Sequence, residues 1–178
     1  ALGHKVWCAV NCSAGQLLKP EFTSEAAEHI AREGLTPQWI EFEITETAAI
    51  EDMDTSVNAL NRLRSMGCKV AMDDFGTGYA SLNYLRRLPI DVLKIDKGFV
   101  ADLMDSERSQ KIVKAVIDLA HALGLTVHAE GIENQAQRQC LTDMGCDRLQ
   151  GYLVSRPLAW DALLPWLDGQ LAGQGNVA

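Results

Sequence analysis

The sequence predicts an α/β fold in which a mainly parallel β-sheet is covered by helices. Short apolar segments of strand length alternate with amphipathic segments of helix length along the chain. At four places a glycine follows a predicted helix and comes just before the next strand, namely at Gly34, Gly67, Gly124 and Gly145. Glycine tolerates the left-handed conformation that ends many helices. The repeated pattern therefore indicates a repeating βα unit, which is typical of a parallel sheet.

Six segments are predicted to be strands because they are short, apolar and bounded by turn residues. In chain order they are residues 5–11, 40–45, 69–73, 92–96, 126–130 and 148–153. The predicted helices cover residues 23–33, 54–66, 106–123, 135–144 and 159–171. The clearest of them, residues 106–123, places its apolar residues at i, i+3, i+4 and i+7 spacing, as expected for a helix with one buried face.

Two architectures fit this alternation, an open doubly wound sheet and a closed (β/α)8 barrel. An open nucleotide-binding sheet usually carries GxGxxG after its first strand, and this sequence has no such motif. Polar side chains instead lie at or near the carboxyl ends of all six predicted strands, namely Asn11, Glu43, Asp73, Asp74, Lys94, Glu130 and Gln150. Barrel enzymes build their active sites at that end. The pattern favours a TIM-barrel-like fold with six of its eight strands in this chain.

Composition narrows the function classes. The 178 residues are 47% hydrophobic and 22% charged, which suits one globular domain with its own core. The formal net charge of −8 argues against binding to polymeric nucleic acid. Five cysteines without a CxxC pair indicate reduced thiols and predict a cytoplasmic location. No apolar run spans a membrane, although a membrane anchor elsewhere in a longer parent remains compatible with this sequence. Residues 172–178 are predicted to form a flexible tail.

The acids at the strand ends favour a metal site. A single acid there is most simply a solvated charge, but polar residues at the ends of six strands favour a shared pocket. Glu43, Asp73, Asp74 and Glu130 would repel one another in close quarters. One or two divalent cations would hold them together, and a set of oxygen ligands indicates Mg²⁺ or Mn²⁺.

Side chains alternate along a strand, so Glu41 shares a face with Glu43, and His128 shares a face with Glu130. Lys94 would lie among the acids, either as their ion-pair partner or in contact with a phosphate or an attacking water. His128 is predicted to be a core histidine whose hydrogen bonds are satisfied.

Five motifs in chain order resemble those of the EAL domain family. They are VNCSAGQL, FEITET, AMDDFGTGYASLNYLRRLPIDVLKID, HAEGIEN and DRLQGYLVSRPL, and together they extend over about residues 6–166. The resemblance implies an EAL-type barrel with one antiparallel strand. It also implies metal-dependent hydrolysis of the bacterial second messenger cyclic di-GMP to linear pGpG.

The resemblance further implies roles for individual residues. Asn11, Glu43, Asp73 and Asp74 match metal ligands of a centre that holds two Mg²⁺ or Mn²⁺ ions. Glu130 matches a further acidic ligand or the base, and Lys94 and Gln150 match the residues that position the attacking water and the phosphate. Glu46 resembles the acid that anchors the DFGTGYASL loop, and Glu133 matches the second acid of AEGxE.

The sequence departs from the family pattern at its beginning. The Glu-Ala-Leu motif, which supplies another metal-ligating Glu ahead of VNxS, is not in this sequence, and neither are the first two strands. Residues 1–171 are therefore interpreted as a partial EAL domain, and this chain alone is expected to be weakly active or inactive. The alternative is a non-catalytic cyclic di-GMP receptor or an interaction module, but the intact acids and DDFGTG segment favour the enzyme. The resemblance also implies a homodimer and fusion to sensor or GGDEF domains.

Overall fold

The computed structural model describes residues 6–76 and 82–174. Within them, six strands form one parallel sheet in which each strand pairs with the next strand of the sequence. The strands are β1 (Cys8–Cys12), β2 (Ile40–Thr45), β3 (Lys69–Phe75), β4 (Val92–Ile95), β5 (Thr126–Ala129) and β6 (Arg148–Leu149). Strand order reverses in a doubly wound sheet, so the uninterrupted order supports the barrel-like architecture and excludes the open alternative.

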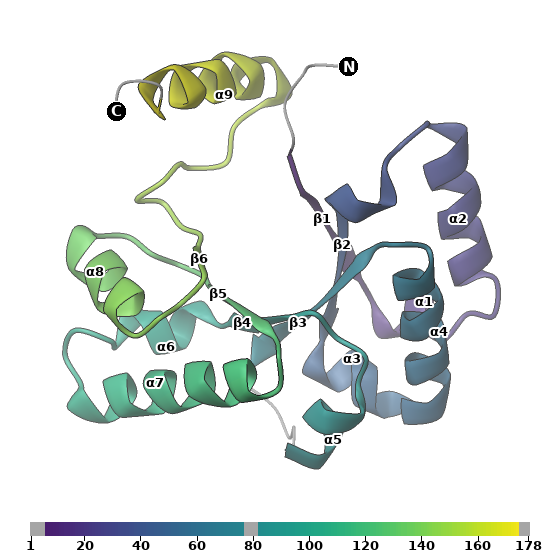
Figure 1. The fold of residues 1–178 in the computed structure, drawn as a ribbon, viewed down its shortest axis with the longest axis horizontal. Helices are drawn as coiled ribbons and strands as arrows, with labels where there is room; N and C mark the ends of the chain where they lie inside the picture. The colour runs from purple at the N-terminus through teal and green to yellow at the C-terminus, as the bar shows by residue number, and fades with distance from the viewer. Residues whose placement is uncertain (1–5, 77–81, 175–178) are drawn as a thin grey trace.

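Helices surround the strands on the outside of the arc that the sheet forms (Figure 1). They are α1 (Ala14–Leu17), α2 (Phe22–Arg32), α3 (Glu46–Glu51), α4 (Met53–Ser65), α5 (Leu82–Arg87), α6 (Lys97–Ala101), α7 (Glu107–Ala122), α8 (Gln135–Asp143) and α9 (Trp160–Gln174), with a 3₁₀ turn at Pro37–Trp39. The five predicted helices are all present as α2, α4, α7, α8 and α9, and the short helices α1, α3, α5 and α6 lie outside those five ranges. None of the described helices is long and apolar enough to cross a membrane.

The two ends of the sheet do not meet. Among the described residues, β1 pairs only with β2, and β6 pairs only with β5. Figure 1 shows α9 above the side on which the arc stays open. Helix α9 continues to Gln174, so the first residues of the predicted tail are helical. Residues 175–178 of that tail lie outside the described residues.

The apolar faces of the strands pack against the helices, as their alternation predicts. Ile44, Leu93 and Val127 are fully buried on the outer side of the sheet, and Leu60 and Ile117 cover them from α4 and α7. The four glycines predicted to end helices all have positive φ angles, which confirms the repeated hinge. The polar faces of the same strands are therefore turned to the inside of the arc.

Strand β6 is shorter than the sequence predicts, because it ends at Leu149 and not at residue 153. The reason is a close approach of two backbones at Gly151. A Cβ atom placed there would lie 2.1 Å from the carbonyl oxygen of Ile132. The chain therefore turns across the segment that follows β5 and stops pairing as a strand.

An aspartate just before a strand fixes the neighbouring strand at two places. Asp91 precedes β4, and its carboxylate accepts the Val70 N–H of β3 at 3.1 Å and an Arg64 N–H of α4 at 3.0 Å. Asp147 precedes β6, accepts the Val127 N–H of β5 at 2.7 Å and lies 2.9 Å from His121 of α7. Partial burial alone would raise the pKa of Asp147, but these two hydrogen bonds hold it below its ordinary value. Each aspartate thus joins two strands and a helix.

We predict that Asp91→Ala lowers the free energy of unfolding by about 1–3 kcal/mol, because the Val70 N–H loses its partner. Asp54→Ala is the matched control, since the Asp54 side chain is 87% exposed in its ion pair with Arg87, whereas that of Asp91 is 15% exposed. The control should cost at most about 0.5 kcal/mol. Urea unfolding measures both losses, and equal losses would contradict the role assigned to Asp91.

Candidate functional site

Lys94 lies at the centre of a cluster of carboxylates. Its Nζ atom is 2.6 Å from Glu43 Oε1, 2.6 Å from Glu130 Oε1 and 3.2 Å from Asp73 Oδ1. Burial alone would lower the pKa of Lys94, but the hydrogen bonds to Glu130 and Glu43 and the charge of Asp73 raise it. The ammonium therefore stays charged and draws three acids from three strands together.

A β-bulge places the Asp73–Asp74 pair. Met72 pairs with Leu93 of β4, but the next pair along β3 joins Phe75 to Ile95, so β3 has one extra residue. Asp74 takes up that residue with a φ of 54°. This left-handed conformation is uncommon outside glycine, and aspartate adopts it more readily than most residues. Burial raises the pKa of Asp74, as do the charges of Asp73 and Asp96.

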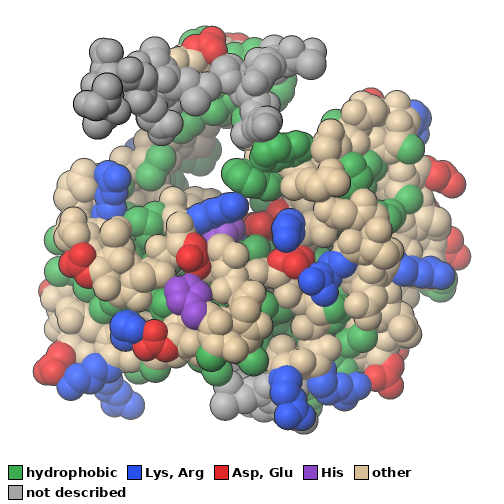
Figure 2. Space-filling model, in the orientation of Figure 1, with side chains coloured by type: hydrophobic (Ala, Val, Ile, Leu, Met, Phe, Trp, Pro, Cys, Tyr) green, Lys and Arg blue, Asp and Glu red, His purple; other side chains and the backbone are tan. Residues whose placement is uncertain are grey.

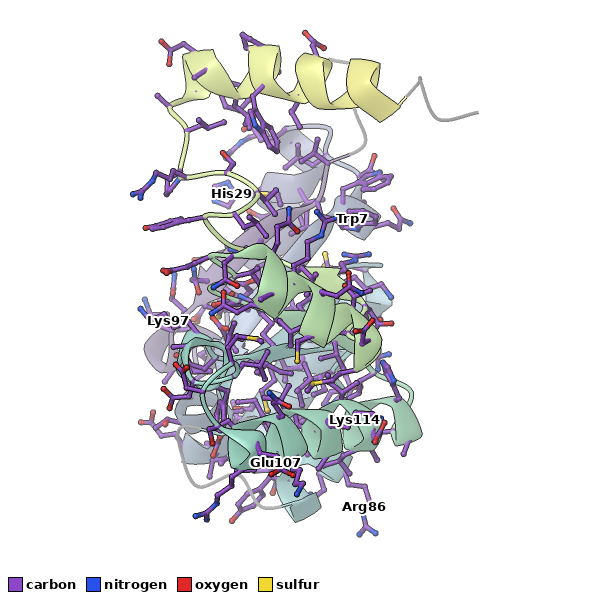
Figure 3. The ribbon with its side chains drawn as sticks, turned by 90° about the vertical axis from the view of Figure 1, so that its left-hand side faces the viewer. Trp7, His29, Arg86, Lys97, Glu107 and Lys114 are labelled. Carbon is purple, nitrogen blue, oxygen red and sulfur yellow. The ribbon has the colours of Figure 1, made fainter. Side chains whose placement is uncertain are left out.

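Asn11 lies beside Glu43, because β1 and β2 pair these two residues in register. Side chains paired in register on neighbouring parallel strands point to the same face of the sheet. Both line a hollow of about 500 Å³ together with Ser13, Gln16 and Thr45, at the carboxyl ends of β1 and β2. In Figure 3, Lys97, which follows β4, lies to the left of Trp7, which precedes β1.

Gln150 lies on the other side of Glu43. It follows β6 and lines a hollow of about 210 Å³ with Glu41, Glu43, His128 and Arg148. Figure 2 shows charged side chains of both signs close together in the middle of the face below α9. The structure thus brings Asn11, Glu43, Asp73, Lys94, Glu130 and Gln150 into one region at the inner face of the sheet.

The two remaining acids of the motifs differ in their surroundings. Glu46, the first residue of α3, is 2% exposed and accepts the Gly76 N–H at 3.4 Å. Gly76 begins the glycine-rich loop, whose residues 77–81 lie outside the described residues. Glu133 is exposed. Its backbone N–H donates to Gln137 Oε1. The structure therefore places Glu46 at the loop and does not bring the Glu133 side chain into the Lys94 cluster.

His128 lies one layer deeper than Glu130, as predicted, but its hydrogen bonding is not satisfied. Its Nδ1 atom is 4.0 Å from Glu41 Oε1, and its buried Nε2 atom has no hydrogen-bond partner among the described residues. Burial, together with the charges of Arg148 and Lys94, lowers the pKa of His128 to about 4. Burial and the charge of Glu43 raise the pKa of Glu41. His128 is thus partly buried, with its side chain 13% exposed, and the prediction that its hydrogen bonds are satisfied is wrong among the described residues.

Two acids near the site were missed as candidates. Glu41 is 6% exposed and faces the same interior as Glu43. Asp96 directly follows β4, and its side chain caps α6 by accepting the Gly98 N–H at 2.8 Å. Strand alternation in IEFEIT and the position of Asp96 at a strand end were signals that could have identified both.

The donor set suits a hard divalent cation. The gathered ligands are carboxylate and amide oxygens, which Mg²⁺, Mn²⁺ and Ca²⁺ prefer. The acids carry more negative charge than Lys94 neutralises. Burial, followed by the charges of Asp73 and Asp96, raises the pKa of Asp74. In the described part of the chain, no three acidic, histidine or cysteine side chains are already arranged around one ion position. The residues therefore fit a metal centre by their chemistry, and the Lys94 ammonium holds the acids together in this structure.

Fold and site define a barrel-type α/β domain with an acidic centre at the carboxyl ends of its strands. The family model described as "EAL domain" matches residues 1–157. The chain therefore belongs to the EAL domain family.

Named relatives and solved structures agree with this assignment. The chain is 42% identical over 166 residues to the cyclic di-GMP phosphodiesterase NbdA of Pseudomonas aeruginosa, covering 93% of this chain and 21% of the relative. It thus spans about a fifth of the length of the curated relatives it matches.

The structure of the PaMucR phosphodiesterase in complex with c-di-GMP matches with a TM-score of 0.85 and 41% identity, over 90% of this chain and 66% of that one. Klebsiella pneumoniae BlrP1, in a complex with manganese and c-di-GMP, matches with a TM-score of 0.81 and 37% identity, over 88% of this chain and 40% of that one.

We predict that the burial of His128 makes the folded state less stable in acid. The folded-state pKa of about 4 lies below the ordinary value of 6.5, so the unfolded chain binds a proton that the folded chain does not. The titration of His128 therefore does not lower the free energy of unfolding above about pH 6.5. The free energy of unfolding decreases as the pH falls from 6.5 toward 4, because the unfolded chain takes up the proton. His128→Met should remove on the order of 1–3 kcal/mol of that pH dependence.

Denaturant unfolding at several pH values measures this difference. His29→Met, on the exposed side of α2, is the control. Parallel pH profiles of wild type and His128→Met would contradict the prediction.

Proposed function

We propose that this domain is a divalent-metal-dependent phosphodiesterase that hydrolyses cyclic di-GMP to linear pGpG. The observation that carries the proposal is the convergence of Glu43, Asp73 and Glu130 on Lys94 at the carboxyl ends of neighbouring strands. NbdA, whose name states this activity, and PaMucR, solved with c-di-GMP, support the choice of substrate. An EAL-type receptor without catalysis is the alternative. The acids of the five motifs found in this sequence are intact, which favours the enzyme.

The proposed cofactor is a pair of Mg²⁺ or Mn²⁺ ions, held by Asn11, Glu43, Asp73, Asp74 and Glu130. When bound, such ions activate water and stabilise the charge that develops on a phosphodiester. The manganese complex of BlrP1 supports divalent metal use in the family. Without added positive charge, the acids would repel the phosphates of a dianionic ligand.

The side chains of this chain have separable roles in the proposed reaction. Hydrolysis forms a bond between water oxygen and phosphorus and breaks the bond from phosphorus to a ribose 3′ oxygen, which takes up a proton to become the free 3′ hydroxyl of linear pGpG. In the proposed reaction Glu130 accepts the proton that the water loses. Lys94, whose raised pKa keeps it protonated, holds Glu43 and Glu130 in position and offers positive charge to a phosphoryl oxygen. Gln150, which lines the same hollow as Glu43, orients the water or the phosphate in this proposal.

We also propose that a longer parent completes the barrel. Beyond β1 and β6 the six-stranded sheet has unpaired edges among the described residues, and a closed barrel of this type has eight strands. Two strands ahead of residue 1 would close the gap and bring the Glu of the Glu-Ala-Leu motif, so residues 1–171 would form part of an EAL domain. A cytoplasmic location, a homodimer and fusion to sensor or GGDEF domains belong to the same proposal. The bifunctional diguanylate cyclase/phosphodiesterase MucR of Pseudomonas aeruginosa supports the fusion.

We predict that Glu130→Gln lowers the rate of pGpG release by at least about 100-fold, because the substitution keeps the shape of the side chain and removes the base. The assay uses the complete parent chain with Mn²⁺, and a chelator should abolish the activity. Glu107→Gln is the matched control, since Glu107 points outward from α7 (Figure 3) in an exposed pair with Lys111. Normal hydrolysis by Glu130→Gln would remove Glu130 from the mechanism.

A second prediction concerns chain length. A longer chain that includes the upstream strands should release pGpG at least about tenfold faster than residues 1–178 alone, because the missing Glu completes the ligand set. Chromatographic measurement of pGpG at equal protein concentration provides the comparison. Equal rates would show that the upstream strands are not needed for the chemistry.

A further inference from the structure

The position of Glu130 relative to Lys94 depends on backbone outside the sheet. Strand β5 pairs with β4 as far as Ala129, opposite Ile95, and the Glu130 N–H donates to the Ile95 carbonyl at 3.2 Å. Beyond this bond the segment 130–134 leaves the sheet. Yet the Glu130 carboxylate must meet the Lys94 ammonium at 2.6 Å. Some contact outside the strands must therefore hold this segment in place.

Close backbone approaches clamp the segment from two sides. Gly131 has a φ of 71°, and a Cβ atom placed on it would lie 2.5 Å from the Cβ of Lys97 at the start of α6. On the other side, the Ile132 N–H donates to the Gln150 carbonyl at 3.1 Å, and the Leu153 N–H donates to the Ile132 carbonyl at 3.0 Å. The segment 130–134 thus fits between α6 and the residues after β6. It contains Glu130 and is hydrogen-bonded to the backbone of Gln150.

One buried side chain ties this segment to α6. Gln137 of α8 is 6% exposed, and its Oε1 accepts the Glu133 N–H at 2.9 Å and the Asn134 N–H at 3.2 Å. Its Nε2 donates to the Val100 carbonyl of α6 at 3.2 Å. Helix α8 therefore lies next to α6 (Figure 1), and α6 begins just after the strand that carries Lys94.

Helix capping alone does not account for this arrangement. Gln137 completes a capping box with Asn134, which needs only its carbonyl oxygen. The capping box of α1 shows the purely local arrangement, since the described side-chain hydrogen bonds of Gln16 in that exposed turn are all made with Ser13. The amide nitrogen of Gln137 instead reaches a carbonyl 37 residues away, in a buried bond.

We propose that Gln137 is a positioning residue that sets the separation between Glu130 and Lys94 by tying the loop after β5 to α6. The proposal rests on the phosphodiesterase function proposed above. Gln137 acts through the backbone and does not touch the reacting groups. Loss of the tie lets segment 130–134 move relative to α6, so that Glu130 spends less time in its working position.

The test compares Gln137→Met with Gln110→Met in the complete parent chain. Gln110 of α7 is a matched control because its Nε2 also donates to a backbone carbonyl, that of Leu103 between α6 and α7, at 2.9 Å. Both substitutions keep side-chain volume and remove the amide. The readouts are kcat, KM, the Mn²⁺ concentration that gives half-maximal rate, the melting temperature, and hydrogen exchange in the peptide covering residues 130–134.

For Gln137→Met we expect kcat to fall about 10- to 100-fold with KM changed less than about twofold, since small displacements of a reacting group have effects of this size. The Mn²⁺ requirement and the exchange of residues 130–134 should rise, whereas Gln110→Met should change none of these readouts at a similar loss of melting temperature. A kcat within about twofold of wild type for Gln137→Met, or equal losses for both variants, would overturn the proposal. A wild-type parent without hydrolysis would instead refute the proposed function.

Discussion

The site depends on one buried ammonium group. Lys94 is 3% exposed and bonds to carboxylates from β2 and from the ends of β3 and β5. Three carboxylates so close together would repel one another in a poorly solvated interior, so the lysine offsets part of the cost of gathering them. Its charge does not balance theirs. This excess of negative charge makes the pocket attractive to divalent cations.

Packing of the sheet against the helices keeps the acidic side chains on its inner face. The apolar faces of β2, β4 and β5 are buried against α4 and α7, which leaves the polar faces to the interior. Asp91 and Asp147 add hydrogen bonds at the opposite end of the strands. These bonds fix the register of neighbouring strands at their amino ends, and the register determines where the acidic side chains lie at the carboxyl ends. The stabilising hydrogen bonds and the acidic cluster thus lie at different ends of the same strands, which is the arrangement typical of the barrel fold.

Much of this could be predicted from local patterns. The period of two in the strands placed Glu43, Lys94 and Glu130 on one face, and glycines with positive φ marked the ends of helices. Features that depend on long-range contacts could not be predicted. The bulge at Asp74 depends on how β3 meets β4, and the early end of β6 depends on the contact between Gly151 and Ile132.

Long-range bonds also explain why some polar residues were misjudged or missed. Gln137 looks in the sequence like an ordinary capping residue, and only its bond to Val100 reveals that it links the loop after β5 to α6. His128 looks like a core residue, and its unsatisfied Nε2 atom is apparent only when its neighbours are known. Patterns along the chain report which face a side chain occupies. They do not report what it meets there.

The exposed edge of β1 affects how this chain behaves in solution. Four of its five residues are exposed, and a free strand edge is a template for pairing with a second chain. Mutual repulsion from the net charge of −8 opposes such contact between copies. Added salt screens that repulsion and leaves the backbone groups of the edge able to pair. Concentrated preparations of residues 1–178 should therefore keep their colloidal stability best at low ionic strength.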